Sequence, residues 1–144
     1  MEEISQILRE IQRCNRVYRE NQLEPLGLTT RHGWFLREVG QNPGISQEQL
    51  SQKLCLNKSN VARQSAAMEE EGYILRKPCG KDKRVLRLYL TEKAQALLPE
   101  IQRITDRWEQ LLTRELTESE AQILNILLPR LLTNAQTAVE EGNP

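Results

Sequence analysis

Residues 45–93 place two short capped helices directly before a hairpin, and this order constrains the fold more than any other feature of the chain. Ser46 and Gln49 have the spacing of a capping box, which begins the first of these helices. Asn57 is the expected N-cap of the second helix, and Gly72 is its expected C-terminal glycine. Because only a short turn separates the two helices, we predict a helix–turn–helix unit.

An alternating pattern after Gly72 predicts an antiparallel hairpin. The strands are expected at 73–77 and 84–90, with a loop at 78–83 between them. Every other residue of the second strand is leucine, which assigns these leucines to one face. Thr91 is the expected cap of the helix that follows.

Apolar residues at three- and four-residue steps predict further helices on both sides of this unit. The expected segments are 3–22, a helix from the cap at Thr29 to Val39, and a helix from the capping box of Thr117 and Glu120 to about Val139. The long helix after Thr91 contains Pro99, which is expected to kink it or to mark a helix boundary. The predicted fold is mainly α with a small β-hairpin.

The distribution of charge along the chain indicates a polyanionic partner. The 144 residues carry 20 Lys and Arg against 20 Asp and Glu, but residues 53–93 hold 10 of the former and only 5 of the latter. Concentrated positive charge of this kind is typical of nucleic-acid binding, so double-stranded DNA is the leading ligand hypothesis. The length suits one domain, or one domain with a helical extension.

Composition disfavours several other classes of protein. No apolar run approaches the ~18 residues of a membrane span, and the N-terminus lacks the apolar core of a signal peptide, so we expect a cytoplasmic protein with no membrane partner. One histidine excludes a multi-histidine metal site within one chain, and three widely spaced cysteines form neither a disulfide framework nor a metal knuckle. Neither an enzyme nor a cofactor is indicated, because the sequence has no P-loop, dinucleotide glycine pattern or nucleophile elbow.

The second helix of the helix–turn–helix has a polar face suited to base recognition. If Val61, Ser65 and Met68 face the core, helical geometry turns the polar residues near the N-terminus of segment 57–71 outward. The candidate DNA-binding residues of this helix are Asn57, Lys58, Ser59, Asn60, Arg63 and Gln64. Arg can bond guanine, and Asn and Gln can bond adenine, in the major groove. The alternative is an ordinary solvated face.

The hairpin loop makes that alternative weaker. Between Arg76 and Arg87 there are six basic residues and one acid, which solubility alone does not explain. The candidate DNA-binding residues of this wing, segment 77–84, are Lys77, Lys81, Asp82, Lys83 and Arg84. Such a loop can reach phosphates or enter the minor groove. We expect Asp82 to orient Arg84 rather than to touch DNA.

At these motifs the chain resembles the MarR family of bacterial winged-helix transcription regulators. The matching segments are LGLT at 26–29, GISQEQL at 44–50, SNVAR at 59–63, MEEEGYI at 68–74, DKR at 82–84 and LYLTEK at 88–93. The resemblance implies an obligate homodimer with intertwined first and last helices, bound to a palindrome, with Arg84 in the minor groove. Two departures are His32, where the family often has Gln, and Ala94, where it often has Gly.

The last helix independently suggests a surface for a second copy. Its apolar stripe is too wide for a short helix of a monomer and consists of Ile123, Leu124, Ile126, Leu127, Leu128, Leu131 and Leu132. The alternative is an ordinary core within one chain. We predict a helical dimerisation region at 1–28 and 95–144, and a winged helix-turn-helix DNA-binding domain at 29–94.

The resemblance also implies a small-molecule effector pocket between the dimer base and the DNA-binding lobe. The candidate lining residues are Arg13, Arg16, Tyr18, His32 and Trp34. Each also has an ordinary structural explanation, as a surface arginine, a packed aromatic or a solvated histidine. Cys14 lies where peroxide-sensing relatives carry a reactive cysteine, but its place on the apolar stripe favours a buried, inert thiol.

The leading functional hypothesis is a dimeric repressor of transcription, modulated by a small ligand or an oxidant. The alternative is a winged-helix module for protein–protein contact that does not bind DNA. Enrichment of a palindrome from random duplexes separates these two hypotheses.

Overall fold

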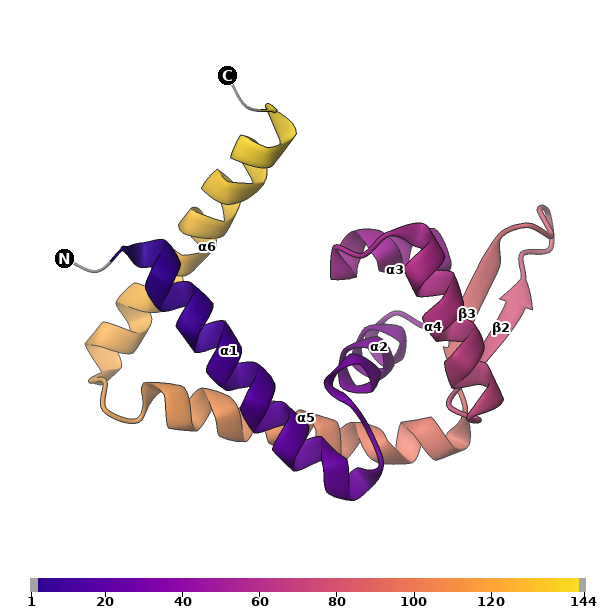
Figure 1. Cartoon of the computed structure of the whole chain (residues 1–144), viewed down its shortest axis with the longest axis horizontal. Coiled ribbons are helices and arrows are strands. Elements are labelled where there is room, and N and C mark those ends of the chain that lie inside the picture. The colour runs from indigo at the N-terminus through magenta and orange to yellow at the C-terminus, as the bar shows by residue number, and fades with distance from the viewer. Residues whose placement is uncertain (1–2, 143–144) are drawn as a thin grey trace. The chain divides into compact units, whose positions relative to one another are not determined.

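The computed structural model describes residues 3–142, which fall into two compact units that meet after Asp106. Figure 1 labels the elements as α1 (Ile4–Leu23), η1 (Glu24–Leu26), α2 (Thr30–Gln41), β1 (Ile45–Ser46), α3 (Gln47–Leu54), α4 (Lys58–Glu70), β2 (Ile74–Pro78), β3 (Leu86–Leu90), α5 (Glu92–Thr113) and α6 (Glu118–Glu140). The prediction of a mainly helical chain with a small β-hairpin is confirmed.

The helix starts lie where their capping residues were predicted. Ser46 Oγ accepts a hydrogen bond from the Gln49 amide at 3.1 Å, and the Gln49 side chain accepts one from the Ser46 amide at 3.0 Å. The Asn57 side chain accepts from the Asn60 amide at 2.7 Å and begins α4. These bonds satisfy amides that the helix itself leaves unpaired, so local sequence alone sets the helix starts.

The sheet contains a strand that the sequence analysis missed. β1 is only two residues long and pairs antiparallel with β3, where Ile45 lies opposite Leu88. β2 pairs with the other edge of β3, so the strand order is β1-β3-β2. A two-residue strand is too short to show alternation, and only its pairing with a distant segment defines it.

The returning strand begins at Leu86 rather than at Arg84, which corrects its predicted start. The Asp82 side chain accepts a hydrogen bond from the Arg84 amide at 3.0 Å, and the Asp82 carbonyl accepts one from the Val85 amide at 3.1 Å. These amides are used in a turn and not in the ladder. Arg84 therefore lies at the tip of the hairpin.

The core of the first unit holds α4 in a defined rotation. Val61 and Ser65 are fully buried and Met68 is 1% exposed, as predicted for the inner stripe of this helix. They belong to a core whose other fully buried apolar residues include Phe35, Leu36, Val39, Leu50, Ile74 and Leu88. The opposite face of α4 is therefore presented to solvent.

The long helix α5 continues through Pro99. The expectation of a helix boundary at this proline is therefore wrong. In α6, the apolar side chains from Ile123 to Leu132 are 38–59% exposed. No helix among residues 3–142 is long and apolar enough to cross a membrane.

Candidate nucleic-acid interface

The N-terminal half of α4 carries the polar face that the sequence predicted. Lys58, Ser59 and Arg63 are exposed, while Asn60 and Gln64 are half-buried at its edges. The Arg63 side chain therefore projects from the helix with a free approach from solvent. This arrangement can present hydrogen-bond donors to base edges in a major groove.

Several candidate residues at the start of α4 also have local structural partners. The Asn57 side-chain oxygen accepts from the Asn60 amide and, at 3.0 Å, from the Ser59 hydroxyl. Lys58 Nζ lies 2.9 Å from the Glu48 carboxylate of α3. Asn57 is thus occupied as a helix cap, and Lys58 is partly neutralised at the surface.

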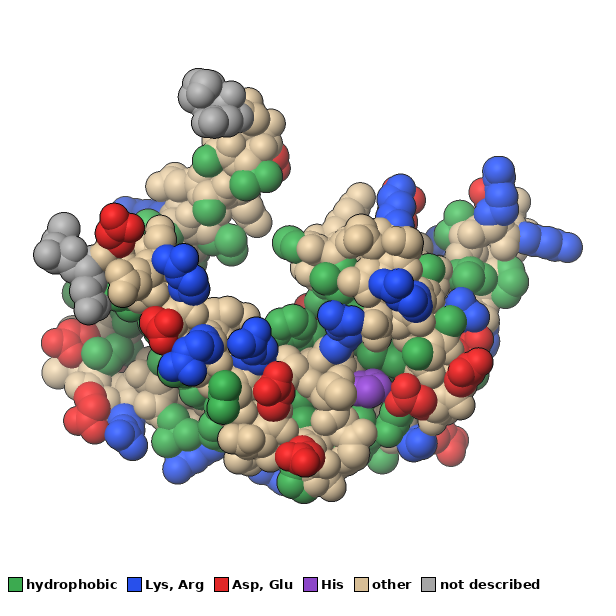
Figure 2. Space-filling view, in the orientation of Figure 1, with side chains coloured by type: hydrophobic (Ala, Val, Ile, Leu, Met, Phe, Trp, Pro, Cys, Tyr) green, Lys and Arg blue, Asp and Glu red, His purple; other side chains and the backbone are tan. Residues whose placement is uncertain are grey.

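The tip of the wing, segment 77–84, carries exposed cations. Lys81, Lys83 and Arg84 are exposed, and Figure 2 shows Lys and Arg side chains at the projecting end of the hairpin. Arg84 Nε donates to Asp82 Oδ1 at 3.3 Å, and the Arg84 side chain is 92% exposed. An ion pair this exposed adds little stability, so its main consequence is the direction in which the guanidinium points.

Lys77 differs from the cations at the tip. It lies on β2, and its ammonium is 5.2 Å from the centre of the Tyr89 ring on β3. This cation–π contact holds the Lys77 side chain along the sheet. It therefore places a positive charge at the base of the wing.

Glu69 and Arg76 join α4 to the base of the wing, a contact that the sequence analysis did not identify. The Glu69 carboxylate accepts from the Arg76 amide at 2.9 Å, from Nε at 3.2 Å and from Nη2 at 3.1 Å. The hydrogen bond from the Arg76 backbone, followed by those from its side chain, lowers the pKa of Glu69. The acidic end of α4 is thus partly a structural anchor for β2.

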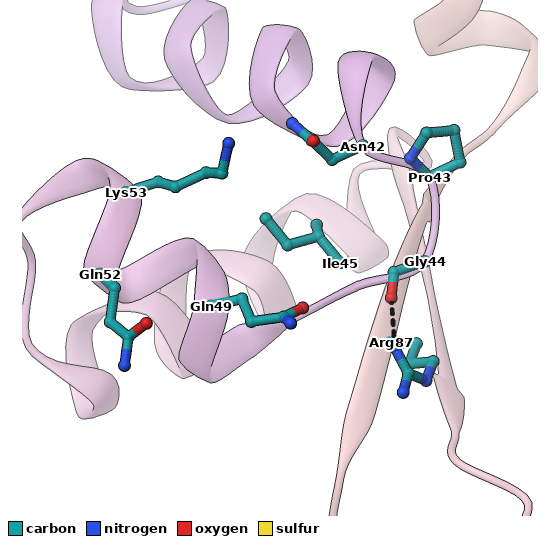
Figure 3. A pocket seen from close by; sticks show the side chains of 8 residues that line it. All are labelled: Asn42, Pro43, Gly44, Ile45, Gln49, Gln52, Lys53 and Arg87. Carbon is teal, nitrogen blue, oxygen red and sulfur yellow. Dashed lines mark hydrogen bonds between the residues drawn. The ribbon is translucent and has the colours of Figure 1, made fainter.

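Arg87 holds the other edge of the sheet. Its Nη1 donates to the Gly44 carbonyl at 2.9 Å, beside a cavity of about 620 Å³. Figure 3 shows Gln49, Gln52 and Lys53 of α3 around this cavity, opposite Arg87. The bond links β3 to the segment that leads into α3.

Cys79 lies at the wing and is half-buried. The Lys81 amide donates toward its sulfur, as do the Arg87 side chain and the Asp82 amide, and these hydrogen bonds lower the pKa of the thiol. A lowered pKa raises the thiolate fraction near neutral pH. Cys79 therefore has an environment that favours a nucleophilic sulfur.

A second cavity, of about 700 Å³, is lined by some of the predicted effector residues but not by all of them. Arg16, His32 and Trp34 line it, together with Gln64 and Glu71 of the α4 region. Arg13 does not line it and instead pairs with Glu10 at 3.0 Å. Tyr18 packs against the hydrophobic core. The lining residues that the sequence analysis missed include Gln64 and Glu71 of the α4 region, because the nearness of α4 to α1 and α2 is a tertiary contact.

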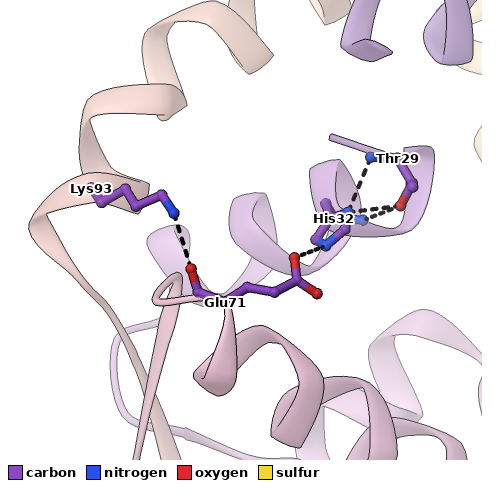
Figure 4. A network of polar contacts seen from close by, with 4 residues as sticks. All are labelled: Thr29, His32, Glu71 and Lys93. Carbon is purple, nitrogen blue, oxygen red and sulfur yellow. Dashed lines mark hydrogen bonds and ion pairs between the residues drawn. The ribbon is translucent and has the colours of Figure 1, made fainter. Parts of the chain in front are cut away.

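His32 forms a polar network on one wall of this cavity (Figure 4). Its Nδ1 accepts from the Thr29 amide at 3.0 Å, and its Nε2 lies 3.0 Å from Glu71 Oε2. The Glu71 carbonyl accepts from Lys93 Nζ at 3.0 Å. The network joins the start of α2, the end of α4 and the first turn of α5.

The prediction that Cys14 is buried is wrong for the single chain. Cys14 is exposed, with Arg13 Nη2 3.9 Å from its sulfur. Its neighbours on the same helix are exposed as well, with Ile7 at 43% and Ile11 at 37%. The reason is that no described segment of the first unit covers this stripe of α1. No group of three or more His, Cys, Asp or Glu among residues 3–142 is arranged to hold a metal ion.

Comparisons with known proteins agree with this architecture. The family model described as "MarR family" matches residues 28–86. The HTH-type transcriptional regulator BilQ of Clostridioides difficile (strain CD3) is 27% identical over 140 residues, which cover 97% of this chain and 94% of that protein.

Solved structures are similar over nearly the whole chain. The transcriptional regulator SlyA superposes with a TM-score of 0.90 at 28% identity, covering 96% of this chain and 98% of that one. A MarR family transcriptional regulator from Listeria monocytogenes, solved in complex with a 26mer DNA, superposes with a TM-score of 0.87 at 26% identity, covering 100% and 98%.

Proposed function

We propose that the chain is a homodimeric repressor of the MarR family of transcriptional regulators and that it binds palindromic duplex DNA. The observation that carries this proposal is the joint presentation of an exposed polar face on α4 and exposed cations on the wing. The Listeria structure supports it, because a protein of the same fold was solved in complex with DNA.

In this proposal, α4 is the recognition helix and lies in the major groove. Arg63 is exposed and can donate two hydrogen bonds to a guanine, while Asn60 and Gln64 lie at the edges of the same face. The wing then reaches the neighbouring minor groove. There Arg84, oriented by Asp82, meets the negative potential of the narrow groove, and Lys81 and Lys83 meet phosphates.

The proposed dimer is supported by apolar surface that each unit leaves uncovered. In α6, Ile126 is 56% exposed and Leu132 is 59% exposed, and in α1 Ile4 is 62% exposed. Monomeric proteins rarely expose apolar side chains in continuous stripes of this kind. A second copy related by a two-fold axis would bury them and place two α4 helices about one turn of DNA apart.

Repression is the simplest consequence of such binding, because a dimer seated on a palindrome within a promoter excludes the polymerase. We further propose that a small ligand modulates it from the cavity lined by Arg16, His32 and Trp34. That cavity also contacts Gln64 of the recognition helix, so an occupant touches the DNA-binding element directly. Modulation by an oxidant would act through a thiol. Cys14 is exposed in the single chain but lies on the stripe of α1 that the proposed dimer would cover, whereas Cys79 lies at the wing.

Selection from random duplexes tests the proposal. We expect the wild-type protein to enrich a palindrome and to bind it with an affinity that falls steeply with salt concentration. The double variant Arg63→Ala, Arg84→Ala should lose this preference. Absence of any enriched duplex would instead favour the alternative, a winged-helix module that contacts another protein.

A further inference from the structure

We propose that His32 is a positioning residue that sets the orientation of the recognition helix by donating a hydrogen bond to Glu71. This inference rests on the proposed function, because it concerns how α4 is presented to DNA. It assigns to His32 a role other than that of lining the effector cavity. His32 touches no DNA in this proposal and acts through the end of α4.

The Thr29 amide selects the tautomer of His32 that can make this bond. A backbone N–H can only donate, and the Thr29 amide lies 3.0 Å from Nδ1, so Nδ1 accepts there with its lone pair. The Thr29 hydroxyl, 2.9 Å from the same nitrogen, accepts from the His32 amide and can itself donate to Nδ1. The ring proton of the neutral imidazole is then on Nε2, which faces Glu71 Oε2 at 3.0 Å. The capping box at the start of α2 thus prepares His32 as a donor toward α4.

The His32 ring is also held in place by packing. Its side chain is 14% exposed, and it meets the Tyr73 ring edge-on with 5.7 Å between the centroids. A side chain confined in this way loses little further freedom when it donates a hydrogen bond. The bond therefore transmits the position of α2 to Glu71.

Glu71 is the point at which three elements meet, as Figure 4 shows. It is the C-cap of α4, and its carbonyl accepts from Lys93 of α5 at 3.0 Å. Lys93 in turn lies 4.3 Å from the centre of the Tyr73 ring. The backbone of the helix end is thus fixed to α5, and its side chain is fixed to α2.

A small tilt of α4 about its C-terminal end displaces the side chains at its N-terminal end by a much larger distance. Arg63 precedes Glu71 by eight residues, or about 12 Å along the helix axis. A tilt of roughly 10° about the C-terminal end would move Arg63 by about 2 Å, which is enough to break a hydrogen bond to a base. Loss of the His32–Glu71 bond should therefore weaken specific binding more than it weakens folding.

The test uses the palindrome that the wild-type protein enriches, as a labelled duplex, and three variants of the full chain. His32→Gln keeps a capping-box residue at the start of α2 but removes the ring nitrogen that faces Glu71. Glu71→Ala removes the carboxylate that accepts from His32 and leaves the capping box of α2 intact. Glu70→Ala is the matched control, since it removes the same charge from an exposed neighbour on the same helix.

We expect His32→Gln to weaken binding to the palindrome about three- to tenfold, as for one partly exposed charge-assisted hydrogen bond. Glu71→Ala should show a similar loss relative to Glu70→Ala. The double variant should be no worse than either single variant, because each removes the same bond. Binding to a scrambled duplex should stay within error of wild type, and the unfolding temperature should fall by no more than about 4 °C.

Wild-type affinity in both His32→Gln and Glu71→Ala would overturn the inference while leaving the proposed function intact. Additive losses, or losses equal on the scrambled duplex, would also overturn it, because they indicate a general structural role. If the wild-type protein enriches no duplex at all, the proposed function fails instead.

Discussion

Glu69 of α4 accepts three hydrogen bonds from Arg76 of β2, one from the backbone and two from the guanidinium. The contact joins α4 to the base of the wing. It therefore relates the two elements that are proposed to enter adjacent grooves, and it makes their relative position sensitive to one carboxylate.

Stability should depend on pH through Glu69. Its pKa is lowered in the folded chain, so its contribution is present above the unfolded pKa and is lost as pH falls through the folded value. We expect Glu69→Gln to be less stable than wild type at pH 7. The difference should begin to shrink below about pH 5, as the ordinary glutamate range is reached. Urea unfolding of both proteins at several pH values measures it, and a difference that grows toward acid would contradict the assignment.

Arg84 and Asp82 should differ in how their loss affects DNA binding. Arg84→Ala removes the proposed minor-groove contact, and we expect a loss of about 1–3 kcal/mol, as for one specific contact. Asp82→Ala removes a negative charge but also the carboxylate that orients Arg84, so we expect a smaller loss rather than a gain. Titration of a labelled duplex measures both. Tighter binding by Asp82→Ala would show that charge, and not orientation, dominates.

Base preference and salt dependence should separate α4 from the wing. Arg63→Ala should flatten the preference at one base position of each half-site while leaving the salt dependence nearly unchanged. Lys81→Ala with Lys83→Ala should weaken binding to all duplexes, and should reduce the slope of log affinity against log salt by about 2 per DNA-bound subunit. Binding at four salt concentrations distinguishes them. If Arg63→Ala and the double lysine variant changed base preference and salt dependence to the same extent, the proposed roles of α4 and the wing would be contradicted.

Cys79 should alkylate at a lower pH in the wild-type protein than in the variant Arg87→Gln. The hydrogen bond from the Lys81 amide, with those from Arg87 and the Asp82 amide, lowers its pKa, so its thiolate forms earlier as pH rises. The pH dependence of iodoacetamide labelling at Cys79, followed by peptide mass spectrometry, measures this. Arg87→Gln should move the Cys79 profile toward higher pH, because it removes one of these hydrogen bonds. Coincident Cys79 profiles in the two proteins would refute the expectation.

The sequence was sufficient wherever structure depends on neighbours along the chain. Ser46, Asn57 and Thr117 cap the helices predicted for them, since a cap bonds an amide only three residues away. The inner stripe of α4 was equally predictable, because the 3.6-residue period fixes which side chains share a face. The polar face that carries the DNA-binding proposal follows from the same period.

Contacts between distant segments were decided by the tertiary structure. β1 exists only because Ile45 meets Leu88, and the Glu69–Arg76 and His32–Glu71 bonds join residues that no periodic pattern relates. The same limit explains Cys14, whose apolar stripe was recognised although its exposure in the single chain was not. A pattern shows that a face is apolar, but which element covers it depends on three-dimensional packing, to which residues far apart in the chain contribute.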